Sequence, residues 1–407
     1  MSVAGVPEAQ FAPLLRAITD EALPVADLAE RFARAAWTVV AEPGDRDTGV
    51  LLAAVGPVRA LELVVSGADA EAIADEVARG GDREPDVDTW TEALKRWRPR
   101  ADPQAALLTL RQAGRFGMRL LTPGDEHWPQ RLDDLQEHAP FALWARGDVG
   151  RLAALERSIA LVGARAATGY GEHVTIELAS GLVDRGFAIV SGAAYGVDGA
   201  AHRAALASRG TTVAVLAGGL DRFYPSGHEQ LLTRIVDRGV ALSEVPPGTT
   251  PTKWRFLLRN RLIAALSDAV VVVEAGWRSG SLNTAGHAGT LGRPLGAVPG
   301  PVTSAASSGC HRLLREYAAV CVTTADEAAE LAGITGRPAA QPDHAADVSG
   351  TRLRVLDAVH ERTPRRVERI AALSGLAPDR VRAELGLLEL EGFVLERPSG
   401  WTRRKEG

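Results

Sequence analysis

The sequence predicts an α/β protein built on an extended Rossmann-like, doubly wound parallel sheet, with an N-terminal helical domain and a C-terminal winged helix. Three observations predict this fold. Short apolar runs alternate with helical stretches in the middle of the chain, Ala-rich amphipathic stretches fill its beginning, and helices followed by a hairpin close it. We expect a helical domain over residues 1–100, the sheet domain over 101–335, a linker over 336–350 and the winged helix over 351–407.

The beginning of the chain predicts helices, with amphipathic stretches at 11–22 and 27–41. Within residues 51–64, Gly56-Pro57 separates two apolar helices and is similar to a helix-hairpin-helix turn, whose backbone amides hold a DNA phosphate. Residues 1–150 carry 16 basic and 25 acidic side chains, however, an excess of negative charge. A plain helical bundle with a Gly-Pro turn is therefore the favoured interpretation.

The middle of the chain predicts a buried sheet. Two early runs, at 116–123 and 141–147, are expected to extend it. The main apolar runs are near-continuous, which indicates burial on both faces, as in a parallel sheet covered by helices on each side. They lie at 158–163, 187–192, 211–219, 240–244, 268–275 and 294–300.

The end of the chain predicts a small helical unit with a hairpin. Amphipathic helices are expected at 351–360, 366–375 and 377–392, and two short strands around Pro398-Ser399-Gly400. This arrangement is typical of a winged helix-turn-helix. The preceding segment, 336–350, is rich in Pro, Ala and Asp without an apolar period and is typical of a linker.

Composition excludes several classes of protein. Apolar residues make up 46% and charged residues 24% of 407 residues, which excludes a disordered or collagen-like chain. We expect no membrane span, no secretory signal and therefore a cytoplasmic protein. Two cysteines, Cys310 and Cys321, supply neither a disulfide framework nor a structural zinc site, and no metal or cofactor is expected. A net charge of −5 argues against indiscriminate coating of duplex DNA but leaves room for a local basic groove.

Glycine- and serine-rich turns follow four of the predicted strands. Ligands of doubly wound sheets bind beyond the carboxyl ends of the strands, and glycine lets the backbone approach them closely. Four such turns on one rim predict a phosphate-binding crevice, with the Arg165 guanidinium aimed at the anion. The spacing matches neither a dinucleotide fingerprint nor a Walker A loop. The turns are Gly163-Ala164-Arg165, Ser191-Gly192-Ala193, Gly218-Gly219 and Ser279-Gly280-Ser281.

The densest basic segment interleaves cations with aromatic rings. Such a segment suits single-stranded nucleic acid, because cations follow the phosphates while aromatic rings stack on bases. The alternative is the start of an amphipathic helix whose apolar residues are core and whose arginines are solvated. The neighbouring phosphate crevice favours binding. The segment reads Lys253-Trp254-Arg255-Phe256-Leu257-Leu258-Arg259-Asn260-Arg261.

No catalytic constellation stands out among the remaining polar residues. Glu244 and Glu274 end strands and could act as acid or base, but no nucleophile, metal cluster or G-x-S-x-G elbow accompanies them. Asp198 is expected to cap the following helix, and His202 to satisfy a local hydrogen bond.

The motifs of the middle region together resemble the DNA-processing protein A family (DprA, or Smf). The resemblance runs in order from about residue 105 to 335, and the C-terminal unit looks like the winged helix often appended to this family. The N-terminal segment is only loosely similar to the family's sterile-alpha-motif-like domain. The matching stretches are 159–171, 189–206, 213–225, 242–248, 255–267, 271–288, 291–302 and 307–314.

The resemblance implies a cytoplasmic, non-enzymatic protein that binds and protects single-stranded DNA. Members load the RecA recombinase onto it during natural transformation and commonly act as homodimers. The family's phosphate-contacting arginine corresponds to Arg165, and its basic-aromatic DNA contacts to Lys253, Phe256, Arg259 and Arg261. Many relatives have a proline before the R-N-R motif where this chain has Leu257.

The sequence allows two other functions. The first is a nucleotide-processing enzyme of the phosphoribohydrolase-like Rossmann group, although the chain lacks that group's P-G-G-x-G-T-x-x-E pattern. The second is a regulator whose winged helix reads duplex DNA. Its expected recognition helix mixes Arg380 and Arg382 with several acidic residues, which fits a solvated face or a protein contact better than a major-groove reader.

Overall fold

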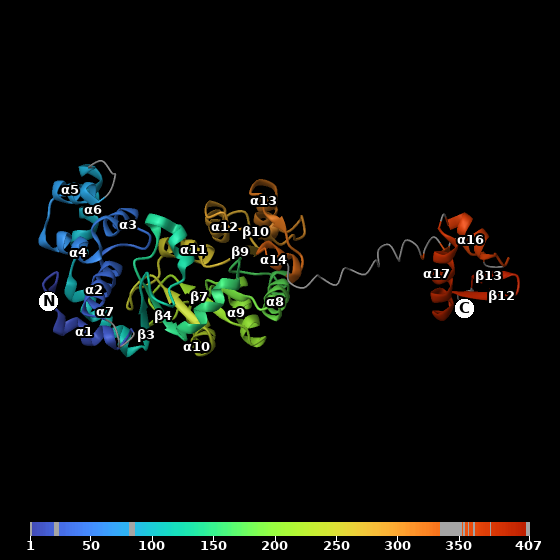
Figure 1. Cartoon of the computed structure of the whole chain (residues 1–407), viewed down its shortest axis with the longest axis horizontal. Helices are drawn as coiled ribbons and strands as arrows, with labels where there is room; N and C mark the ends of the chain where they lie inside the picture. Colours follow the sequence, from blue (N-terminus) through green and yellow to red (C-terminus); the bar gives the residue numbers. More distant parts are fainter. Residues whose placement is uncertain are drawn as a thin grey trace. The chain divides into compact units, whose positions relative to one another are not determined.

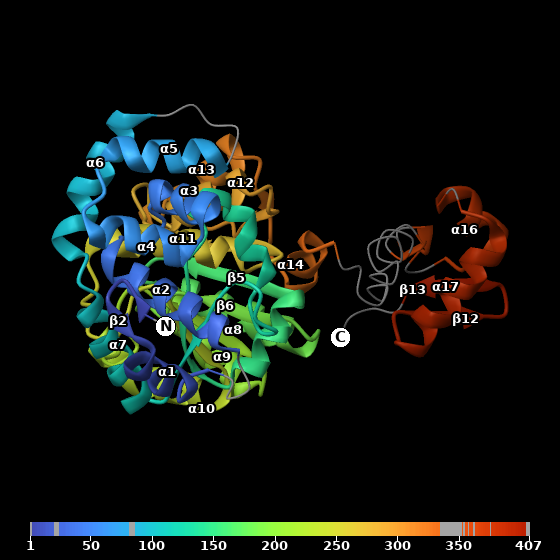
Figure 2. The same ribbon diagram turned by 60° about the vertical axis from the view of Figure 1, so that its left-hand side comes forward.

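The computed structural model divides the chain into two compact units, Met1–Thr335 and Gly336–Gly407, which we describe separately (Figures 1 and 2). The structure describes residues 2–19, 24–80 and 86–333 of the first unit. In the second it describes 352, 355–356, 358–360, 363–374 and 376–403. The expected linker, 336–350, lies outside the described residues.

The first unit begins with a short hairpin and a helical layer. Aromatic side chains fill its core: the Phe11 and Phe32 rings stack at 4.6 Å, and Trp37 meets Trp97 edge-on at 5.4 Å. The elements are β1 (Ser2–Val3), β2 (Val6–Pro7), α1 (Glu8–Arg16), α2 (Val25–Val40), α3 (Arg46–Val55), α4 (Pro57–Ser66), α5 (Ala70–Gly80), α6 (Val87–Trp97), the 3-10 turn η1 (Arg98–Arg100) and α7 (Pro103–Arg115). Helix α1 ends earlier than expected because the chain then turns to the sheet edge, where Ile18 O accepts a hydrogen bond from Leu120 N.

The Gly-Pro turn predicted from the sequence joins α3 to α4. Gly56 has φ +78°, a left-handed conformation that glycine adopts without strain, and Pro57 takes the first position of α4. No single helix in the described residues is long and apolar enough to cross a membrane; α3 and α4 reach that length and composition only together, bent by 112°. Their apolar side chains, including Leu51 and Leu61, are buried in the helical core.

Nine of the described strands form one mixed sheet, in the order β11-β10-β9-β5-β6-β7-β8-β4-β3. Neighbouring strands are parallel from β11 to β8, whereas β4 and β3 add to the β8 edge in antiparallel pairs. The prediction of a doubly wound Rossmann-like sheet is confirmed. The strands are β3 (Met118–Leu121), β4 (Leu143–Gly147), β5 (Ser158–Gly163), β6 (Ala188–Ser191), β7 (Thr212–Leu216), β8 (Val240–Ser243), β9 (Ala269–Glu274), β10 (Leu295–Ala297) and β11 (Val320–Cys321).

Helices cover both faces of the sheet. Alternate residues of β5 face opposite ways: Ile159 and Leu161 pack with one buried cluster, and Ala160 and Val162 with another. The first cluster includes α8 (Gly169–Asp184), α9 (Val197–Ala207) and α14 (Ala325–Leu331); the second includes α11 (Lys253–Ala265), α12 (Ser281–Thr290) and α13 (Ser308–Glu316). The remaining elements are α10 (Glu229–Arg238) and the 3-10 segments η2 (Gln130–His138), η3 (Val149–Arg157), η4 (Ser226–His228) and η5 (Ala305–Ser307).

The second unit is a winged helix, as predicted. Helices α16 (Val367–Ser374) and α17 (Pro378–Leu390) precede a hairpin of β12 (Val394–Arg397) and β13 (Gly400–Arg403). Gly400 closes the hairpin at φ +133°. The expected first helix, 351–360, falls only partly within the described residues. On α17, Arg382 is held by Asp379 at 2.8 Å.

Ion pairs tie the helical layer to α11 of the sheet domain. Arg255 donates to Glu42, with Nη2 at 2.8 Å from Oε1. Arg261 donates through both terminal nitrogens to Glu244 at 2.6 and 2.7 Å, and Glu244 also accepts from Gly44 N at 3.2 Å. The side chains of Arg261 and Glu244 are almost fully buried. The carboxylate of Glu244 thus links the sheet, α11 and the helical layer.

The substitution Arg261→Ala is expected to lower the free energy of unfolding by about 3–5 kcal/mol, because it leaves the buried Glu244 carboxylate without its cation. Chemical denaturation of the full chain measures this change. As a control, Arg234→Ala removes an exposed cation on α10 and should shift stability by no more than about 0.5 kcal/mol. Equal losses in the two variants would contradict the structural role of the pair.

Candidate functional site

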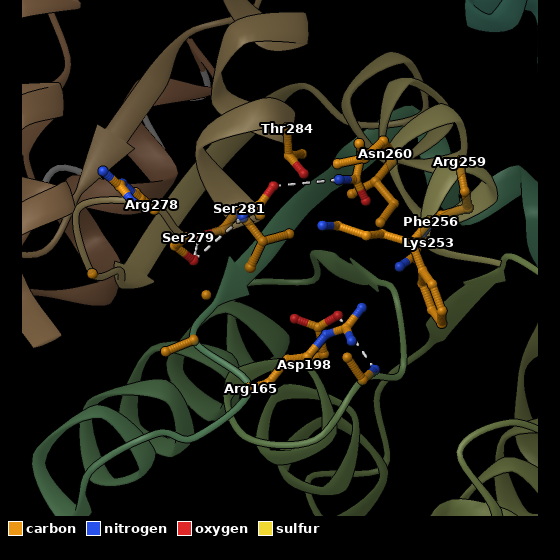
Figure 3. Close-up of a pocket in the computed structure, with 18 of the residues that line it drawn as sticks. Arg165, Asp198, Lys253, Phe256, Arg259, Asn260, Arg278, Ser279, Ser281 and Thr284 are labelled. Carbon is orange, nitrogen blue, oxygen red and sulfur yellow. Dashed lines mark hydrogen bonds between the residues drawn. The ribbon is translucent and has the colours of Figure 1, made fainter.

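A crevice opens where the strand order of the sheet reverses. From β5, the chain adds β6, β7 and β8 on one side and β9, β10 and β11 on the other. The carboxyl ends of β5 and β9 therefore flank a topological switch point, where doubly wound sheets bind ligands. A cavity of about 860 Å³ lies there, lined by residues from the β5–α8 and β9–α12 loops and from α11 (Figure 3).

The loop after β5 holds Arg165 at the crevice. A Cβ at Gly163 would lie 2.6 Å from Val197 Cγ2 and 2.8 Å from Glu274 O, so only glycine fits there. The loop is fixed at its far end by the buried Glu274 carboxylate, which accepts hydrogen bonds from Thr168 N at 2.8 Å and Thr168 Oγ1 at 2.7 Å. Both oxygens of Glu274 are thus engaged in holding the loop.

The Arg165 guanidinium lies over the Phe256 ring. Its central carbon is 4.6 Å from the ring centroid, a cation–π contact, and the guanidinium is exposed to solvent. The Tyr224 ring packs beside Phe256 at 5.7 Å. Figure 3 shows Arg165 and Asp198 on one side of the crevice with Lys253 and Phe256 across from them. A cation, Arg165, and an aromatic ring, Phe256, therefore lie together at the crevice.

The basic segment forms the first turns of α11, which begins after the Thr252 cap, whose side chain accepts from Arg255 N. Because the segment is helical, its cations point in different directions. Lys253 and Phe256 face the crevice, and Lys253 is exposed with no ion-pair partner among the described residues. Arg255 and Arg261 instead point to the helical layer and to Glu244. The structure therefore does not bring Arg261 to the crevice.

Arg259 lies next to Asp198 in the lining of the crevice, with most of its side chain buried. Arg259 is 6% exposed, donates to Val215 O, and burial lowers the pKa of its guanidinium to about 10. Asp198 is 7% exposed and accepts from Gly192 N at 3.2 Å, so it bonds back to the preceding loop and does not cap its own helix. A Cβ at Gly192 would come within 2.1 Å of Arg259 Nη1. Gly192 thus makes room for the guanidinium.

Of the other residues predicted for the site, some lie outside the main crevice and others line it. Ser191 is buried and donates to Leu161 O at 2.7 Å, away from the cavity. Gly192, Gly218 and Gly219 line a small adjoining space of about 10 Å³ beside Tyr224 and Phe256. Ser279 and Gly280 do line the main crevice, where they lead into the N-terminus of α12, the positive end of a helix dipole.

Several residues that line the crevice were not predicted from the sequence. Tyr224, Trp277 and Arg278 all line the cavity. These residues belong to two turns that follow predicted strands, Asp221-Arg222-Phe223-Tyr224 and Gly276-Trp277-Arg278. Each turn combines a cation with an aromatic residue, and this combination could have identified Tyr224, Trp277 and Arg278 from the sequence. The described residues contain no group of three or more His, Cys, Asp or Glu side chains that could hold a metal ion.

Comparison with known proteins decides the family. The model of DNA recombination-mediator protein A matches residues 119–333, and that of the DprA winged helix domain matches 337–400. The chain belongs to the DprA/Smf family. A protein of Mycobacterium tuberculosis named for DprA is 43% identical over 382 residues, which cover 90% of this chain and 93% of that protein. Protein Smf of Escherichia coli is 36% identical over 75% of this chain and 82% of its own length.

A solved structure shows the same architecture. The crystal structure of DprA from Streptococcus pneumoniae aligns with a TM-score of 0.57 and 31% identity, over 76% of this chain and 99% of that one. The family resemblance expected from the sequence is therefore confirmed by the family models, by curated DprA/Smf relatives and by a solved DprA structure.

The substitution Asp198→Asn should change how stability depends on pH. Burial raises the pKa of Asp198 above its ordinary 3.8, although Arg259 and Arg165 oppose the rise. The folded protein therefore keeps this proton at pH values where the unfolded chain has lost it, so stability falls as pH rises from 3.8 through the folded-state pKa. The variant lacks that fall.

Denaturation of the wild type and Asp198→Asn across a pH series tests this expectation. The stability of the variant relative to the wild type should increase with pH over that window and then become constant. A difference between the two proteins that does not vary with pH would contradict it.

Proposed function

We propose that this protein is a non-enzymatic mediator that binds single-stranded DNA in the crevice. The observation that carries the proposal is the stacking of the exposed Arg165 guanidinium on Phe256, with Lys253 on the same crevice wall. A cation on the face of a half-buried aromatic ring supplies the two kinds of group that single-strand binding uses, a phosphate contact and an aromatic surface. The positive N-terminus of α12 adds a further contribution favourable to phosphate.

The distribution of charge supports the same ligand. Arg255 and Arg261 are paired with carboxylates. Arg259 lines the crevice but is only 6% exposed, so the exposed cations among the lining residues are Arg165, Lys253 and Arg278. Few phosphate contacts together with aromatic rings favour an unpaired strand, whose bases are free to stack, over a duplex. The carboxylate of Glu274 is held by Thr168, which supports a structural role and not general acid or base catalysis.

The substitutions Arg165→Ala and Lys253→Ala should each weaken binding to single-stranded DNA by roughly 5- to 30-fold, equivalent to about 1–2 kcal/mol. Each removes one phosphate contact, so the slope of log affinity against log salt should become shallower by about 0.7. Fluorescence anisotropy with labelled oligonucleotides of mixed sequence, at several salt concentrations and with duplex competitor, measures both quantities.

Arg234→Ala provides the matched control, because α10 contributes no residue to the crevice. It should leave affinity and salt slope unchanged. Wild-type affinity in both crevice variants would contradict the proposed site, and a preference for duplex would contradict the proposed ligand. Base release from a panel of nucleotides, lost in Glu274→Gln, would instead favour the nucleotide-processing alternative.

We propose further that the protein works in the cytoplasm as a homodimer, protects incoming single strands during natural transformation, and loads RecA onto them. Membership of the recombination-mediator family supports this role. Light scattering tests the dimer, and nuclease protection of a bound oligonucleotide tests shielding. RecA filament assembly on single strands should be faster with the protein present, and Arg165→Ala should lose that stimulation.

A further inference from the structure

An aromatic platform lies at the rim of the crevice, on the loop between β9 and α12. Trp277 lines the cavity and is 55% exposed, although an indole ring normally favours burial. The next residue, Arg278, also lines the cavity, is exposed and has no ion-pair partner among the described residues. Figure 3 shows Arg278 and Ser279 at a rim separate from Phe256 and Lys253.

Helix α13 holds the indole in place. Gly309 approaches the β9–α12 loop so closely that its N–H donates to Ala275 O at 2.7 Å, and a Cβ there would lie 2.5 Å from Gly276 O. This approach places Arg312, one turn later, over the Trp277 ring with its central carbon 5.1 Å from the centroid. The guanidinium covers one face of the indole.

Arg312 makes further contacts near the end of α13. Its Nε donates to Glu316 Oε2 at 2.8 Å, Nη2 donates to the Tyr317 hydroxyl at 3.3 Å, and its central carbon lies 5.5 Å from the centroid of the Tyr317 ring. Trp277, Arg312 and Tyr317 therefore form a stacked set, which we call the rim platform. A ring held in advance loses less conformational entropy when a ligand stacks on it.

Trp254 shows what an exposed tryptophan without such support looks like. It is 62% exposed at the start of α11, has no ring or cation contact among the described residues, and does not line the cavity. The two tryptophans have similar exposure but differ in restraint and in access to the crevice.

We infer that the rim platform is a second base-stacking subsite, which takes a nucleotide of the same strand beyond the one bound at Phe256. The inference rests on the proposed binding of single-stranded DNA. One base stacks on the open face of Trp277, while Arg278 meets the phosphate that leads to it. The rim platform is continuous with the crevice through the α12 N-terminus, where Ser279 and Gly280 line the path.

Oligonucleotide length separates the two subsites. With an oligonucleotide of about 16 nucleotides, Trp277→Ala should weaken binding about fivefold or more, the lower range for loss of one stacked base. With one short enough to occupy only the Phe256 site, the loss should disappear. The salt slope should be unchanged at both lengths, because stacking releases no counterions. Fluorescence anisotropy on the full chain measures both properties.

Trp254→Ala is the matched control and should bind both lengths as the wild type does, whereas Trp277→Phe should recover part of the affinity lost in Trp277→Ala. Equal weakening of short and long strands by Trp277→Ala would overturn the second subsite, and so would wild-type affinity for the long strand. Failure of Arg165→Ala and Lys253→Ala to weaken either length would instead overturn the crevice itself. The two failures are thus distinguishable.

Discussion

The crevice depends on one constraint of chain topology: β5 and β9 lie side by side but pass into helices on opposite faces of the sheet. Helix α8 follows β5 onto one face, and α12 follows β9 onto the other. Because the two loops diverge, a cavity remains between the strand ends in the described part of the first unit. The close approach at Gly163 and the Glu274–Thr168 hydrogen bonds then hold one loop, while Gly309 holds the other. The residues that line the crevice are thus carried on two loops whose backbone is held by contacts with the rest of the domain.

Burial decides which of the clustered cations remain available to a ligand. Arg255 and Arg261 lie on α11 beside Lys253, but their partners, Glu42 and Glu244, neutralise them at the contact with the helical layer. The Arg261–Glu244 pair is buried, and a buried pair adds little net stability over apolar packing but is costly to break, so it fixes the position of α11. Lys253 and Phe256 are presented to the crevice because the other side of the helix is anchored. The N-terminal helical layer, through Glu42 and Gly44, therefore positions the basic segment.

The sequence predicted the sheet well, because strands buried on both faces leave continuous apolar runs that few other structures require. It also predicted the winged helix and the glycine turns. It could not separate Arg261 from Lys253, because composition shows cations in a segment but not the carboxylates that meet them. Glu42 lies more than two hundred residues from Arg255 in the sequence. Tyr224 and Trp277 were missed although each lies near an arginine in a turn that follows a strand, because only the fold shows that these two turns meet at the crevice.

The crevice is lined by both charged and aromatic side chains, and their balance determines how the affinity for a single strand would depend on salt. Asp198 lies beside Arg165 and Arg259 in the crevice lining, so where its carboxyl group is ionised the local field is weaker than the arginines alone would give. A purely cationic groove holds a strand through many phosphate contacts and releases it mainly when salt rises. A groove with few free cations and several aromatic rings draws more of its affinity from stacking, which salt changes little. Such a site would retain selectivity for unpaired bases at physiological ionic strength, as the proposed binding of single-stranded DNA requires.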